Sequence, residues 1–350
     1  MKADDEPPRH SRVHSIRRRR ALRDPVLGEL LAQTSRSFYL SLAALPAPTR
    51  ELAGLAYLLA RAADTIADAS VAPTLVRAAL LARYVPALAD EDRGSFLADV
   101  RVARDAMRGS DAESRLLDAL PAAFSAHDRQ PAEERARTGA LLATLTRGMR
   151  DDLARFGTPA GEVRALANRT ELLEYAYRVA GCVGEYWTTL HADHLPRIAR
   201  LDRPALVAAG VAYGQGLQLV NILRDVPTDL ALGRCYLPAD ALARAGLRPS
   251  ALLDPAHARA VHGLMAEHVA LARSLLAQGV RYARAIPRAH LGLHLASRWP
   301  ADLGRATLDL LETALTHGPP RAVKVPRRWV YGIVAGSALA CFVASRPRVL

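Results

Sequence analysis

Cysteine, lysine and aromatic residues are scarce in this chain of 350 residues. The three cysteines, Cys182, Cys235 and Cys341, lie far apart, so they form neither a metal-binding spacing nor a disulfide framework. A reducing compartment is the simplest expectation. Aromatic residues make up only 5% of the chain, and β-branched clusters are few, which argues against a sheet-rich fold. The basic N-terminal segment is not followed by an apolar stretch, so it does not resemble a secretory signal.

Lysine is nearly absent, because Lys2 and Lys324 are the only lysines among 47 basic residues. The formal net charge of +12 therefore comes from arginine. Arginine suits a phosphate ester, a nucleic acid or an anionic membrane. A genome biased toward arginine explains the same excess. Charge thus names classes of partner without choosing one.

Alanine, leucine and arginine are abundant instead, and half of the residues are apolar, which is enough for a large core. The pattern predicts an all-α fold in a single domain, with no internal repeat and no strand. The helices are expected at 26–43, 48–69, 73–90, 95–109, 111–127, 133–155, 160–166, 169–193, 203–226, 257–286, 288–296, 300–316 and 327–344.

Three regions follow from the composition. Residues 1–24 predict a disordered basic tail, and residues 25–326 predict the helical domain. Residues 327–350 contain an uncharged run of 17 residues, 329–345, with arginines on both sides. That length is at the short limit for crossing a bilayer. A terminal helix that packs on the core or lies on a membrane surface is the preferred interpretation.

A polar stripe marks the expected helix 48–69, which is apolar on nearly every other face. Tyr57, Arg61, Asp64 and Asp68 fall within a sector of roughly 60° at about 100° per residue. Carboxylates buried without partners cost on the order of several kcal/mol each or become protonated. Arg61 can pair with one of the two aspartates. The other requires a cation that the nearby sequence does not supply.

A second stripe lies on the expected helix 203–226. Gln218, Asn221 and Asp225 are spaced i, i+3 and i+7 on an otherwise apolar helix. Asp229 follows four residues later, but Pro227 intervenes and is expected to kink or end the helix near Asp225.

Two such stripes that face each other would hold a small Mg²⁺ cluster, because this ion prefers carboxylates, waters and phosphate oxygens. Arg61, Arg224 and Arg234 could then grip a diphosphate through paired hydrogen bonds. Salt bridges between the helices are the alternative. The presence of two stripes, each with an amide or an arginine in register, favours the metal site.

Four blocks of sequence resemble the squalene/phytoene synthase family of head-to-head prenyl synthases, over about residues 27–325. In chain order they are Thr34-Ser35-Arg36-Ser37-Phe38, Asp64-Thr65-Ile66-Ala67-Asp68, Tyr175-Ala176-Tyr177-Arg178-Val179-Ala180-Gly181, and Gln218 to Asp229 with the turn Gly233 to Pro238. The last block is the most specific. Ala67 and Thr228 depart from the pattern, because the family often has glutamate at these places.

The resemblance implies a fold and a reaction. The fold is a single-domain class I isoprenoid (terpenoid) synthase, a helical bundle around a central cavity. The reaction is the Mg²⁺-dependent condensation of two farnesyl diphosphates through presqualene diphosphate to squalene, with NADPH as hydride donor. Residues 285–288 and 324–331 resemble squalene synthases more than phytoene synthases. Phytoene, dehydrosqualene, presqualene diphosphate and hydroxysqualene synthases remain alternatives within the family.

The resemblance also implies site residues, position by position. The implied catalytic residues are Tyr57, Tyr175, Asp64 and Asp225. The implied diphosphate-binding residues are Ser35, Arg36, Arg61, Gln218, Arg224 and Arg234. The implied Mg²⁺ ligands are Asp64, Asp68, Asn221, Asp225 and Asp229.

The expected partners are farnesyl diphosphate and, peripherally, membrane lipid, but not nucleic acid; the oligomeric state stays open. The expected location is the cytoplasm, at the inner face of the membrane. Gly214-Gln215-Gly216 lacks the third glycine and the preceding strand of a dinucleotide loop, so it predicts a close helix contact, and no motif places NADPH. A basic membrane-surface scaffold without catalysis is the alternative of another class. It explains the arginines but not the two stripes.

Overall fold

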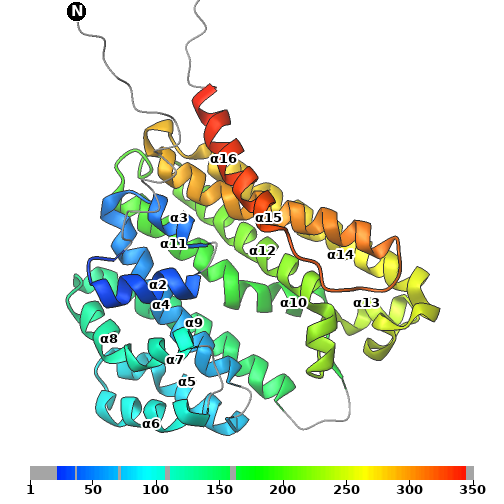
Figure 1. Cartoon of the computed structure of the whole chain (residues 1–350), viewed down its shortest axis with the longest axis horizontal. Coiled ribbons are helices and arrows are strands. Elements are labelled where there is room, and N and C mark those ends of the chain that lie inside the picture. The colour runs from blue at the N-terminus through cyan, green and yellow to red at the C-terminus, as the bar shows by residue number, and fades with distance from the viewer. Residues whose placement is uncertain (1–21, 36–37, 70–71, 107–110, 158–162, 344–350) are drawn as a thin grey trace, which may run out of the picture.

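The computed structural model describes residues 22–35, 38–69, 72–106, 111–157 and 163–343. Over these residues the chain forms a helical bundle with one small two-stranded sheet (Figure 1). The α-helices are α2 (Pro25–Ser35), α3 (Phe38–Ala44), α4 (Ala47–Asp68), α5 (Thr74–Leu88), α6 (Arg93–Ala106), α7 (Asp111–Asp118), α8 (Leu120–Asp128), α9 (Ala132–Phe156), α10 (Arg169–Ala176), α11 (Cys182–His194), α12 (Arg203–Ala231), α13 (Ala239–Arg244), α14 (Ala258–Ala285), α15 (Leu291–Leu315) and α16 (Arg327–Val343). The strands are β1 (Arg164–Leu166) and β2 (Arg234–Pro238).

Four short helical turns complete the chain. A π-helical turn, Tyr177–Gly181, joins α10 to α11. The 3-10 turns are Pro249–Leu253, Pro255–His257 and Arg288–His290. The expected all-α class is confirmed. Of the expected basic tail 1–24, residues 1–21 lie outside the described residues.

The expected helix 160–166 and the expected absence of strands are wrong. Arg164–Leu166 is strand β1, which runs parallel to β2 with Arg164 opposite Arg234. Residues 160–162 are not among the described ones. The Arg164 amide also donates to the Gly233 carbonyl at 3.2 Å. The backbone N–H and C=O groups of the buried strand β2 require hydrogen-bond partners, and β1 supplies them. β1 has only three residues, which is too short for the alternation of apolar and polar residues that would predict a strand.

Two expected helix boundaries next to prolines are also wrong: the end at residue 226 and the gap at 297–299. α12 continues past Pro227 to Ala231, and α15 continues past Pro300, so the expected helices 288–296 and 300–316 are largely one. A proline inside a helix costs about 3 kcal/mol, because it removes a hydrogen bond and crowds the preceding turn. Val226 and Trp299, directly before the two prolines, are buried in the core. Their packing offsets the lost hydrogen bond.

Other expected helices are subdivided. The expected helix 26–43 covers α2 and α3, and residues 36–37 between them lie outside the described residues. The expected helix 111–127 is α7 and α8, with Pro121 in the first turn of α8. Proline is tolerated there because the first turn has no internal partner for its missing amide.

α12 runs through the bundle between α11 and α14 (Figure 1). A Cβ atom on Gly214 would lie 2.3 Å from the Ala180 carbonyl oxygen, and one on Gly184 would lie 2.0 Å from that of Gly210. The close helix contact expected at Gly214-Gln215-Gly216 is therefore confirmed. Among the described helices, α12 is also long and apolar enough to cross a membrane, but half of its most apolar stretch is buried, as in a core helix.

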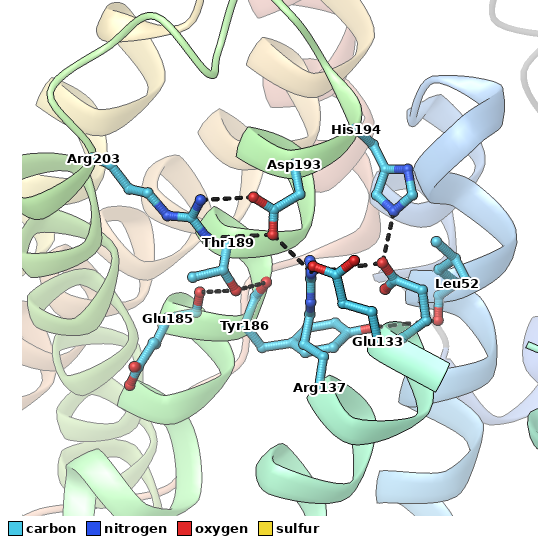
Figure 2. Close-up of polar contacts among 10 residues, drawn as sticks. Leu52, Glu133, Arg137, Glu185, Tyr186, Thr189, Asp193, His194 and Arg203 are labelled. Atoms are coloured by element: carbon cyan, nitrogen blue, oxygen red, sulfur yellow. Dashed lines mark hydrogen bonds and ion pairs between the residues drawn. The ribbon is translucent and has the colours of Figure 1, made fainter. Parts of the chain in front are cut away.

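A polar network ties α9 to α11 and to the start of α12 (Figure 2). Arg137 contacts Asp193 at 2.7 Å and Glu134 at 3.6 Å. His194 lies 2.9 Å from Glu134, and Arg203 donates to the second oxygen of Asp193 at 2.6 Å. The Glu134 side chain is only 6% exposed. The network therefore fixes one side of the bundle by charge as well as by packing.

The C-terminal helix expected at 327–344 is α16, which packs against α15. Val334 is buried in the core, whereas Trp329 and Tyr331 are exposed. α16 is thus attached to the bundle by one face and leaves an aromatic pair on its surface.

Candidate active site

The first stripe lies on α4. Arg61 pairs with Asp64 one turn later and also with Glu113 of α7. Burial, the largest influence, lowers the pKa of Arg61, but the two carboxylates and Tyr57 together raise it. Arg61 thus forms an ion pair with one aspartate of its own stripe, as expected, and a second ion pair that connects α4 to α7.

The two aspartates of this stripe repel each other. Burial and then the charge of Asp68 raise the pKa of Asp64 to about 6, although Arg61 opposes the shift. Burial also raises the pKa of Asp68, and Arg234 is the strongest influence that lowers it. The Asp64 side chain remains 39% exposed. A divalent cation can reach this carboxylate and would relieve the repulsion.

The second stripe lies on α12. Arg224 donates to Asp225 through Nε at 2.8 Å, and its Nη2 pairs with the second oxygen. Burial and then Asp225 raise the pKa of Asp229 to about 7, and Arg234 opposes that shift. The second stripe therefore also has two carboxylates, Asp225 and Asp229, and only Asp225 is paired with the neighbouring Arg224.

The uninterrupted helix extends this stripe. Because α12 continues through Pro227, Asp229 stands on the same helix as the expected ligands before it. Asn221 is exposed, and its amide donates to the half-buried Gln218 at 3.5 Å. Amide and carboxylate oxygens therefore share one side of the helix.

Arg234 of β2 brings the two stripes together. Its guanidinium lowers the pKa of Asp68 on α4, of Asp229 on α12 and of Asp152 on α9. Its Nη1 lies 3.6 Å from the Asp152 carboxylate. One arginine thus lies within electrostatic reach of acids from three helices. Asp68 of the first stripe and Asp229 of the second are thus influenced by the same guanidinium, and their joint binding of a metal stays a prediction.

Tyr57 stands on α4 one turn before Arg61. Its ring stacks on Phe38 with 5.5 Å between ring centroids, and its hydroxyl donates to the Thr34 carbonyl at 3.4 Å. Its aromatic face is held in place beside the first stripe.

Tyr175 stands on α10 beside the second stripe. Its ring stacks on Tyr236 with 4.8 Å between centroids. Burial raises its pKa well above the usual value, with further contributions from Asp152 and Asp229. The Tyr236 hydroxyl donates to Asp152 at 2.9 Å. Tyr57 therefore belongs to the first stripe, whereas Tyr175 lies in a cluster of phenols and carboxylates on α10, β2 and α9.

Two expected residues are less well placed. Ser35 is buried and its hydroxyl donates to the Leu31 carbonyl within α2. Arg36 lies outside the described residues. Their contact with diphosphate stays a prediction.

Several residues of the site were not expected. They are Arg77, Glu113 and Asp152, which approach from α5, α7 and α9, and Tyr236, which lies inside a recognised block without an assigned role. Asp152 is half of an Asp-Asp pair on an ordinary amphipathic helix. No local signal distinguishes it from its surface neighbour Asp151, since only the fold turns one inward.

The donor set fits Mg²⁺. Among the residues that the structure describes, no three histidine, cysteine, aspartate or glutamate side chains are close enough together to hold a metal by themselves. Mg²⁺ commonly uses one or two carboxylates and completes its six ligands with waters and substrate phosphate. Burial and the neighbouring aspartates raise the pKa values of Asp64 and Asp229, and a divalent cation would counter the repulsion between these acids.

Two cavities of the bundle lie elsewhere. One of about 510 Å³ lies between α6, α7 and the start of α8, and one of about 910 Å³ lies beside α9 and β1. Neither is lined by an expected site residue. The candidate site is therefore defined by its converging charges.

Comparison with known proteins connects this arrangement to prenyl synthases. Residues 31–329 match the family described as squalene/phytoene synthase. A bifunctional lycopene cyclase/phytoene synthase of Phaeosphaeria nodorum is 33% identical over 242 residues, which are 68% of this chain and 38% of that protein. The 15-cis-phytoene synthase of Enterobacter agglomerans is 34% identical over 149 residues, 43% of this chain and 45% of that protein. The chain thus covers less than half of either relative.

Solved structures share the fold. The squalene synthase TcSQS with the ligand E5700 matches with a TM-score of 0.69 at 22% identity. The match covers 89% of this chain and 86% of the TcSQS chain. A ligand-bound dehydrosqualene synthase matches with a TM-score of 0.63 at 20% identity. The match covers 92% of this chain and 97% of the synthase chain. Such likeness extends the architecture over nearly the whole chain.

Proposed function

Because the chain belongs to the squalene/phytoene synthase family of head-to-head prenyltransferases, we propose that it condenses two farnesyl diphosphates through presqualene diphosphate to squalene. The observation that carries this proposal is the convergence of acids from α4 and α12 around Arg234. A scaffold without catalysis has no use for repelling, half-exposed acids on two core helices. The resemblance of residues 285–288 and 324–331 to squalene synthases supports the choice of product.

In the proposed reaction, the C1–O bond of one substrate breaks and the diphosphate leaves with the electron pair. Arg61, Arg224 and Arg234 bind its oxygens and stabilise the developing negative charge. Mg²⁺, held by Asp64, Asp68, Asn221, Asp225 and Asp229, would supply further positive charge to the leaving group. Gln218, with Ser35 and Arg36, completes the proposed diphosphate contacts.

The allylic cation then bonds to the C2=C3 alkene of the second substrate, and loss of a proton closes a cyclopropane. The faces of Tyr57 and Tyr175 stabilise cationic carbon by about 0.5–2 kcal/mol when water is excluded. A phenol of this pair can pass the lost proton to the departing diphosphate. Ionisation of the cyclopropane diphosphate and rearrangement complete the carbon skeleton.

For squalene, NADPH would supply the hydride that quenches the last cation. The residues described do not reveal its site, because Gly214-Gln215-Gly216 is occupied by the helix crossing. We therefore assign no residue to this cofactor.

Phytoene synthesis is the second candidate, because the curated relatives compared above are phytoene synthases. Incubation with Mg²⁺ and either farnesyl or geranylgeranyl diphosphate, with and without NADPH, separates the two. We expect squalene from farnesyl diphosphate only when NADPH is present. Phytoene from geranylgeranyl diphosphate would assign the other product, and no coupled product from either substrate would refute both.

Mg²⁺ should stabilise the protein more at about pH 8 than at about pH 5.5. The pKa values of Asp64 and Asp229 are raised to about 6 and 7 from the ordinary 3.8, so the folded protein binds protons more tightly than the unfolded chain. Their contribution to stability is therefore full below pH ~3.8 and is lost as the pH rises through these raised values. Mg²⁺ binds the deprotonated form and offsets that loss.

The measurement is the shift in Tm on addition of Mg²⁺ at the two pH values. In the double variant Asp64→Asn/Asp225→Asn the shift should largely disappear. An equal shift at both pH values would contradict the assignment.

We also propose that the protein is cytoplasmic and touches the inner face of the membrane through α16. The exposed Trp329 and Tyr331 follow Arg327 and Arg328, a combination suited to a lipid headgroup region. Sedimentation with anionic vesicles tests this contact; recovery of all protein in the supernatant at low salt would exclude it.

A further inference from the structure

Arg77 is a buried cation beside the first stripe. It stands in the first turns of α5 and is only 7% exposed. Nη1 donates to the Ala67 carbonyl at 2.6 Å, and Nη2 donates to Thr74 Oγ1 at 3.2 Å. Because Ala67 directly precedes Asp68, these contacts place the guanidinium at the end of α4 that bears the proposed metal ligand.

No carboxylate pairs with Arg77 among the residues that the structure describes, and its buried Nε has no hydrogen-bond partner there. The other arginines of the site differ. Arg61 and Arg224 each pair with a carboxylate of their own stripe, and Arg234 lies 3.6 Å from Asp152. Arg77 alone of these four is held only by neutral oxygens.

The surroundings make this cation more costly. Burial and the like charge of Arg234 both lower the pKa of Arg77, and Asp68 only partly opposes them. An ionised group buried without a counter-ion is strongly disfavoured in an apolar environment. Two guanidinium groups within electrostatic reach of each other, one of them with an unused donor, are an arrangement that an anion with several oxygens stabilises.

We propose that Arg77 is a further substrate-binding residue, which together with Arg234 binds the oxygens of the leaving diphosphate at the C-terminal end of α4. This inference rests on the proposed function and adds a fourth arginine to its diphosphate site. The diphosphate would then lie between the arginine pair and the Asp68 end of the acidic stripe. No bond forms or breaks at Arg77, which contributes charge and hydrogen bonds.

A purely structural role is the competing explanation, because a cation at the end of a helix also stabilises its last carbonyl groups. The two roles differ in what a substitution changes. A structural role affects the free energy of unfolding, whereas a binding role affects the affinity for diphosphate in protein that remains folded.

The experiment compares Arg77→Gln with the wild type in Mg²⁺-dependent binding of inorganic diphosphate by calorimetry, and in KM for farnesyl diphosphate. Loss of charge-assisted hydrogen bonds should weaken diphosphate binding by about 10- to 100-fold and raise KM. Arg77→Lys retains the positive charge but not the paired hydrogen-bond donors of the guanidinium. Its diphosphate affinity and KM should therefore lie between those of the wild type and of Arg77→Gln. It also serves as the test if Arg77→Gln does not fold.

The matched control is Arg83→Gln, on the same helix. Arg83 is partly exposed and pairs with Asp92 and Asp99, away from the stripes. Its substitution should leave diphosphate affinity unchanged. If folded Arg77→Gln, or Arg77→Lys in its place, binds diphosphate as tightly as the wild type, the inference is overturned, while the proposed function stands. If the wild type neither binds diphosphate nor forms a prenyl product, both fail.

Discussion

Asp64→Asn and Asp225→Asn should each lower the rate of diphosphate release from farnesyl diphosphate by about 10³-fold, or about 4 kcal/mol of transition-state stabilisation. The amide keeps the shape of the side chain but removes the charge that would hold Mg²⁺ against the leaving group. The reduction should appear mainly in kcat, because the charge on the diphosphate develops as the C1–O bond breaks.

The losses in rate caused by the two substitutions should not multiply in the double variant. Groups that act as one unit in a site give non-additive losses, so the double variant should be little worse than either single one. Independent, distant sites would instead give additive free energies. The double variant therefore distinguishes one shared site from two unrelated salt bridges.

Asp309→Asn is the matched control. Asp309 lies on the surface of α15, is 65% exposed and pairs with Arg273 of α14. Its rate should stay within about twofold of the wild type, as expected for a surface pair. Single variants at Asp64 and Asp225 that retain more than about a tenth of wild-type activity would remove the basis of the proposed site.

Arg137→Met should lower the free energy of unfolding by about 3–5 kcal/mol. Arg137 is 12% exposed and lies 2.7 Å from Asp193 (Figure 2). It also lies 3.6 Å from the buried Glu134. Removal of the cation leaves Glu134 paired with His194 at 2.9 Å and weakens the contact between α9 and α11. The buried Glu134 then has one positive partner fewer, so less of the cost of its desolvation is offset.

Urea unfolding of Arg137→Met and of Arg203→Met measures the effect. Arg203 pairs with the same Asp193 but is 49% exposed, so its loss should cost only about 0–1 kcal/mol. The double variant Glu134→Leu/Arg137→Met should recover part of the loss, since apolar residues can replace a buried ion pair. Equal effects of the two single variants would show that burial does not decide the strength of this network.

The expected helical class needed no tertiary information, because an Ala- and Leu-rich chain with few aromatics favours helix at nearly every position. The breaks were less reliable. Pro227 predicts a helix end by local chemistry, and the expected helices leave a gap before Pro300. Val226 and Trp299 are nevertheless buried and both helices continue. The segment 164–166 pairs with a strand 70 residues away, at Arg234 to Pro238, which no local pattern reveals.

The site divides in the same way. Asp64 and Asp68, like Asp225 and Asp229, were expected because charge inside an apolar helix is costly and spacing alone displays it. The unexpected groups are Glu113, 52 residues from its partner Arg61, and Asp152, 84 residues from its partner Tyr236. Each lies on a helix whose own pattern is ordinary.

Sequence alone therefore determined that this chain is helical, that it carries two unusual acidic stripes and which family it resembles. The tertiary structure decided which charges share a neighbourhood: that Arg234 faces acids from three helices, and that Arg77 is buried beside it without a carboxylate. The physical reason is that helix periodicity is a short-range property written in each segment. Electrostatic partnership depends instead on distances set by the packing of the whole bundle.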